Sequence, residues 1–86
     1  MLTNETLLTT ILKEKEHFLA CLKEEELASR GIKEYCESRG IHFVYTLYSD
    51  ERRQSRVYKE LTDNFSMELS WQEFNDHWDT IEEFLS

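Results

Sequence analysis

The sequence has no proline and only two glycines, Gly31 and Gly40, among its 86 residues. Because these residue types mark turns, their scarcity disfavours a loop-rich all-β fold and favours helices joined by short turns. No apolar run approaches the roughly 18 residues that a membrane-spanning helix needs. The first residues carry neither a basic stretch nor a long apolar one, so no signal peptide is predicted.

Cysteine is also scarce, since the chain has only Cys21 and Cys36. Two cysteines do not make a disulfide framework, and we expect free thiols in a reducing cytoplasm. The length predicts a single domain over residues 1–86. With 40% hydrophobic and 13% aromatic residues, the chain is too apolar to be disordered and can build one core.

Basic residues are missing from one part of the chain. Residues 1–59 hold ten acids and all ten lysines and arginines, whereas residues 60–86 hold eight acids and no lysine or arginine. The whole formal charge of −8 therefore lies in the last third of the chain. Such an asymmetry indicates an interaction surface that repels nucleic acid and attracts basic proteins.

The hydrophobic periodicity predicts a mainly α fold, a compact bundle of about four helices. Their approximate ranges are 4–22, 25–39, 50–65 and 70–85. Gly40 is a suitable terminator for the second helix, and a bend is expected at the acidic run 24–26. The fourth helix has the clearest start, because Ser70 and Glu73 form a capping box.

Residues 41–48 are the one strand-like segment, dense in β-branched and aromatic residues. A lone strand needs a partner. The alternative fold is therefore α+β, with a small antiparallel sheet formed with residues 65–69 or shared across a dimer.

The strongest candidate site is a group of carboxylates in the C-terminal third, which we name the acidic face. It comprises Glu68, Glu73, Asp76, Asp79 and Glu83. Carboxylates spaced by about one helical turn can imitate phosphates or fill a groove lined with lysine and arginine. The ordinary explanation is a solvated helix face, but such faces mix charge signs, and this one has no basic residue.

Two further groups bear on binding. Tyr45 and Tyr48 are candidate partner-binding residues, because tyrosine is enriched in interface hot spots. Arg52, Arg53, Arg56 and Lys59 are expected to form salt bridges to the acidic fourth helix. This pairing within one chain or across a homodimer is preferred to phosphate binding, which the negative field opposes.

The sequence predicts no metal, no cofactor and no catalytic site. His17 and Cys21 have the i,i+4 spacing of two metal ligands, and Cys36 and His42 would complete a Cys₂His₂ set, but no tight C-x₂-C pair is present. There is no phosphate-binding loop, nucleophile elbow or histidine-rich motif. We therefore expect a protein that is not an enzyme.

Together these features predict a small acidic inhibitor that covers the basic surface of a nucleic-acid-binding protein. Antirepressors of phages, anti-defence proteins and immunity proteins against toxic nucleases follow this logic of charge and size. No direct contact with nucleic acid or membrane is expected. The alternative is a structural or adaptor subunit, which docks into a larger complex and leaves its acidic part in solvent.

Overall fold

A computed structural model describes the backbone of residues 4–42 and 45–86 and the side chains of residues 5–42 and 49–86. The chain is mainly α, as predicted, and these residues form five helices and no strand. The helices are α1 (Asn4–Lys13), α2 (Lys15–Ser38), α3 (Tyr45–Asp63), α4 (Trp71–Asp76) and α5 (Trp78–Phe84).

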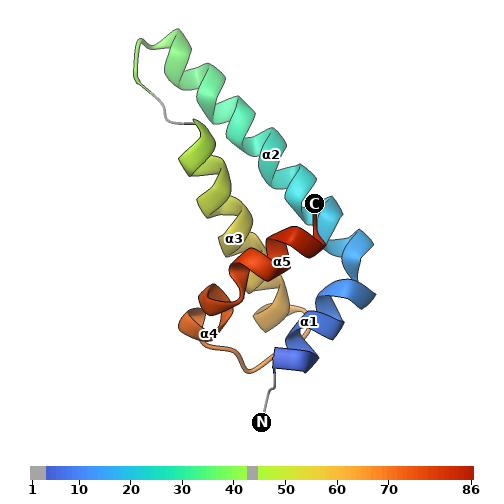
Figure 1. Ribbon diagram of the computed structural model, residues 1–86. Helices are drawn as coiled ribbons and strands as arrows, with labels where there is room; N and C mark the ends of the chain where they lie inside the picture. Colours follow the sequence, from blue (N-terminus) through green and yellow to red (C-terminus); the bar gives the residue numbers. More distant parts are fainter. Residues whose placement is uncertain (1–3, 43–44) are drawn as a thin grey trace.

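The five helices form a long hairpin on a globular base. Helices α2 and α3 run side by side in opposite directions, and α1, α4 and α5 gather at one end of the pair (Figure 1). The domain extends over 48 × 24 × 22 Å. Its radius of gyration is 14.4 Å, whereas a compact chain of this length has about 12 Å. The predicted compact four-helix bundle is therefore replaced by an elongated arrangement.

The first bend lies at Glu14, between α1 and α2, and not at the acidic run 24–26, which stays helical within α2. This early break folds α1 back against α5. Leu7 and Ile11 can then reach the common core. The acidic run remains helical because two of its carboxylates are neutralised by arginines of α3.

Gly40 ends α2 as predicted. Its φ of +70° is the left-handed conformation that glycine adopts without steric cost. The amide of Ile41 donates to the carbonyl of Cys36, and the amide of Gly40 donates to that of Glu37. These two bonds form a Schellman motif, which satisfies carbonyls left free at the end of the helix.

The predicted strand over residues 41–48 is wrong where the structure describes it. Residues 45–48 are the first turn of α3, residues 41 and 42 are in neither helix nor strand, and residues 43–44 lie outside the described residues. The proposed partner segment, 65–69, is an irregular link between α3 and α4. A helix satisfies its own backbone hydrogen bonds, so without a partner strand it prevails over the modest β-propensity of this run.

The hydrophobic core lies in the base and draws on all five helices. Its buried members are Leu7, Ile11, Phe18, Leu22, Val57, Leu61, Leu69, Phe74, Ile81 and Leu85. Ser70 caps α4 as predicted, because its hydroxyl oxygen accepts a hydrogen bond from the amide of Glu73 at 3.2 Å. In and just after α4 and α5, Phe74, Ile81 and Leu85 are buried, whereas Trp71 is 45% exposed.

The outer half of the hairpin has almost no core. Ser29 is the single buried residue among the described residues from 23 to 42. Three large apolar side chains here are more than half exposed, and we name them the apolar tip. They are Leu27, Tyr35 and Ile41. The tip is thus a projecting arm whose apolar side chains are not covered by the rest of the described chain.

Candidate partner-binding surface

The five carboxylates of the acidic face are all exposed. Among the residues whose side chains the structure describes, none of the five takes part in an ion pair. The carboxylate of Glu73 accepts a hydrogen bond from the Ser70 hydroxyl at 3.2 Å, which completes the cap of α4. The negative charge of this surface is therefore not neutralised by cations of the described chain.

The acidic face is not carried by one straight helix. The expected fourth helix is interrupted at His77, which ends α4 and begins α5. Glu73 and Asp76 lie on α4, and Asp79 and Glu83 lie on α5. Glu68 precedes α4 in the irregular link. The carboxylates are consequently distributed over two short helices and the segment before them.

Tyr45 and Tyr48 are far from the acidic face. They lie in the first turn of α3, at the end of the hairpin that points away from α4 and α5 (Figure 1). Their side chains lie outside the described residues. The seven predicted binding residues thus fall at two ends of the molecule: five at the base and two beside the apolar tip.

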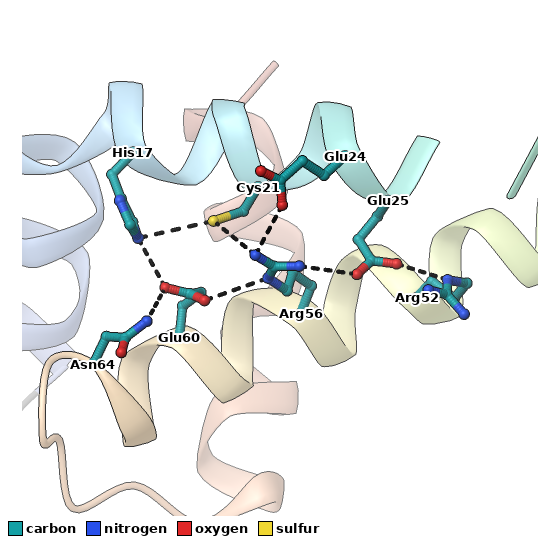
Figure 2. A network of polar contacts seen from close by, with 8 residues as sticks. All are labelled: His17, Cys21, Glu24, Glu25, Arg52, Arg56, Glu60 and Asn64. Atoms are coloured by element: carbon teal, nitrogen blue, oxygen red, sulfur yellow. Dashed lines mark hydrogen bonds and ion pairs between the residues drawn. The ribbon is translucent and has the colours of Figure 1, made fainter. Parts of the chain in front are cut away.

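Arg52 and Arg56 of α3 face α2 and not the acidic face. Figure 2 shows the contacts, which we name the polar seam. Its members are His17, Cys21, Glu24, Glu25, Arg52, Arg56, Glu60 and Asn64. The Arg52 Nε lies 2.7 Å from a Glu25 carboxylate oxygen. Arg56 reaches Glu24 at 3.1 Å and the second oxygen of Glu25 at 3.2 Å.

The expected salt bridges from these arginines to the fourth helix are therefore wrong. Arg52 and Arg56 pair with the acidic run on α2, which was assigned to a bend in the sequence interpretation. A bridge from one helix to its hairpin neighbour costs little chain entropy, because the packing of α2 on α3 already fixes both backbones. On the same helix Lys59 is exposed and Arg53 is half-buried, and neither takes part in an ion pair among the described residues.

Glu60 is the buried carboxylate at the inner end of the seam. It is 7% exposed. His17 Nε2 lies 2.8 Å from one of its oxygens, and the Asn64 amide donates to the same oxygen. The hydrogen bond with His17 and that from Asn64 lower the pKa of Glu60, outweighing burial, and the charge of Arg56 lowers it further. Glu60 is thus held as a carboxylate at neutral pH.

Cys21 lies next to this carboxylate but is not an activated nucleophile. Burial, followed by the nearby charge of Glu60, raises the pKa of the thiol above its ordinary value. The Sγ atom and the Glu60 carboxylate both contact the same nitrogen of His17, Nε2. In a catalytic triad, the histidine contacts the nucleophile with one ring nitrogen and the acid with the other. Because Cys21 and Glu60 share Nε2, these three residues do not have that arrangement.

Sequence reasoning paired His17 with Cys21 but did not include Glu60. His17 and Cys21 lie one turn apart on α2, whereas Glu60 is 43 residues beyond His17 on α3. No spacing rule joins residues so distant in sequence. Cys36 and His42, the other two members of the weighed Cys₂His₂ set, lie near the opposite end of the hairpin.

Comparisons with protein-family models, with curated proteins and with solved structures found no match for this chain. Within the described residues, no helix is both long and apolar enough to cross a membrane. The interpretation of the surface therefore depends on its geometry and charge.

Proposed function

We propose that the chain is a non-catalytic inhibitor that binds the basic surface of a nucleic-acid-binding protein through the acidic face. The observation that carries this proposal is the exposure of all five carboxylates without an ion pair in the described part of the chain. Antirepressors, anti-defence proteins and immunity-type proteins share this physical logic. The free thiols suit a reducing cytoplasm.

The distribution of cations supports this proposal. Arg52 and Arg56 were the best internal candidates to neutralise the acidic face, and both are engaged by carboxylates of α2. This also weakens the case for a homodimer held by α3 of one copy and the acidic helices of the other. Like charges at close spacing cost stability, so a partner rich in lysine and arginine gains by relieving that repulsion.

The expected mechanism is competition. Carboxylates of the acidic face pair with target arginines and lysines, and the chain occupies the surface that phosphates would use. Opposite potentials steer the two proteins together, so association is fast at low salt and slows as salt screens the charges. No chemical step is needed.

The apolar tip favours a second candidate, the docked subunit. Leu27 and Tyr35 are each 57% exposed on α2, and Ile41 is 53% exposed just after it. Tyr45 and Tyr48 follow at the start of α3 and belong with this end of the hairpin. An arm of this kind fits an apolar groove in a larger assembly, with the acidic base left in solvent.

Elution by DNA separates the two candidates. The tagged chain is immobilised, loaded with a nuclease-treated lysate, and eluted at constant low salt with short duplex DNA or with an uncharged polymer. We expect DNA alone to release the captured protein, because the acidic face and DNA compete for one basic surface. A partner that stays bound in the presence of DNA and resists high salt would exclude competition and support the subunit.

A further inference from the structure

The inner end of the polar seam gathers three different metal-ligating side chains. His17 Nε2, Cys21 Sγ and a carboxylate oxygen of Glu60 all lie within 4.8 Å of one another. The first two come from successive turns of α2 and the third from α3, and Figure 2 shows all three pointing into one space. We propose that His17, Cys21 and Glu60 bind a divalent transition-metal ion, for which zinc is the best match.

The donor set decides which ion fits. Imidazole, thiolate and carboxylate are the three ligand types that zinc takes from proteins. Magnesium and calcium prefer oxygen ligands alone, so a site with one sulfur and one nitrogen disfavours both. The absence of a metal was expected from the sequence, because its four candidate ligands lacked a tight motif. In the structure, His17 and Cys21 form a group with Glu60 instead of with Cys36 and His42.

Two of the three distances between ligand atoms are near those of a tetrahedral centre, and the third, from Cys21 Sγ to the Glu60 oxygen, is within 4.8 Å. With ordinary zinc bond lengths, the nitrogen and sulfur ligands of one ion lie about 3.6 Å apart and the nitrogen and oxygen ligands about 3.4 Å apart. Cys21 Sγ is 3.8 Å from His17 Nε2, and the Glu60 oxygen is 2.8 Å from the same nitrogen. The ion would enter this hydrogen bond and lengthen it by about half an ångström.

The neighbouring residues can support a bound ion. Arg56 lies 3.6 Å from Cys21 Sγ and 3.4 Å from the Glu60 oxygen that does not face His17. It is held in place by Glu24 and Glu25, so it can remain a hydrogen-bond donor to Cys21 and an ion-pair partner of Glu60. Polar contacts from a neighbouring side chain of this kind orient metal ligands.

Charge and access are also suitable. A thiolate and a carboxylate together neutralise the two charges of the ion, and the thiol proton of Cys21 passes to solvent on binding. The cluster is open on one side, because the His17 side chain is 44% exposed. This opening gives the ion a path and leaves room for water as the fourth ligand.

The test is metal binding by the reduced, metal-free chain. We expect one zinc per chain after equilibrium dialysis, and free zinc at about a hundred times Kd should raise Tm by about 15 °C. Cobalt should give a thiolate charge-transfer band.

His17→Gln and Cys21→Ser should each weaken binding more than about a hundredfold, and Cys21→Ser should also remove that band. The matched controls Cys36→Ser and His42→Gln should bind as the wild type does.

Several outcomes would overturn the site. One is no retained zinc in the wild-type chain, and another is a cobalt complex without a thiolate band. A third is loss of zinc in Cys36→Ser or His42→Gln with retention in the two cluster variants. His17 is largely at the surface, so His17→Gln should keep the helical circular dichroism spectrum of the wild type. This readout separates lost binding from lost folding.

Discussion

Replacing Phe18 with alanine should lower the free energy of unfolding by about 4 kcal/mol, because large-to-small changes in a core remove apolar contact and leave a cavity. Phe18 is fully buried at the start of α2, and its ring stacks on Phe65 with centroids 5.5 Å apart. A chain of this length has only about 4–13 kcal/mol of stability in total. The variant should therefore lose between about a third and all of its stability.

Leu19→Ala is the matched control, since it removes an apolar side chain from the adjacent position. Leu19 is 38% exposed, and we expect a loss of about 1 kcal/mol or less. Urea denaturation followed by tryptophan fluorescence measures both variants, because Trp71 and Trp78 lie on the helices of the base. Equal losses for the two variants would mean that Phe18 contributes no more to the stability of the core than the exposed Leu19.

The second large effect is expected at Arg56. Methionine at this position keeps much of the apolar stem but removes the charge that Glu24, Glu25 and Glu60 share. Glu60 is left buried without its cationic neighbour, and breaking such a buried pair costs about 3–5 kcal/mol. We expect about 3 kcal/mol, the lower end, because the Arg56 side chain is 27% exposed.

Arg30→Met provides the comparison for Arg56→Met. Arg30 forms an i,i+4 ion pair with Glu26 on the outer surface of α2, where the two side chains are 61% and 48% exposed. Exposed pairs of this kind contribute about 0.5 kcal/mol or less. Chemical denaturation of both variants tests the role of the seam. A loss at Arg56 as small as that at Arg30 would show that the seam does not stabilise the hairpin.

Local signals in the sequence were sufficient for several elements. The capping box at Ser70 and the glycine at position 40 predicted where one helix starts and another ends, and both are confirmed. Helical periodicity also predicted a mainly α chain, and the apolar residues Phe18, Phe74 and Ile81 of the predicted helical ranges are buried in the core. These features depend on residues within one or two turns of each other, which is the range in which sequence patterns carry information.

Features that depend on distant residues were not predictable. The break at Glu14 follows from the packing of α1 on α5, and the helical state of residues 45–48 follows from the absence of a partner strand. The polar seam joins α2 to α3 across intervals of 27 to 43 residues. The acidic face was proposed from composition, and its five carboxylates are exposed. Composition could not show that Arg52 and Arg56 pair with α2 instead.

The most direct test of the central claim is charge reversal on the acidic face, with the affinity for the captured partner as the readout. The test variant carries three lysines, at Asp76, Asp79 and Glu83. The control carries the same change in net charge at three exposed acids of α1 and α2. These are Glu5, Glu16 and Glu34.

Both variants should keep the helical circular dichroism spectrum, because all six positions are exposed. We expect the test variant to lose at least about a hundredfold in affinity, since close opposite charges across an interface become like charges. The control should lose only a few-fold, through weaker long-range attraction. Equal losses in the two variants, or no loss in either, would contradict binding through the acidic face.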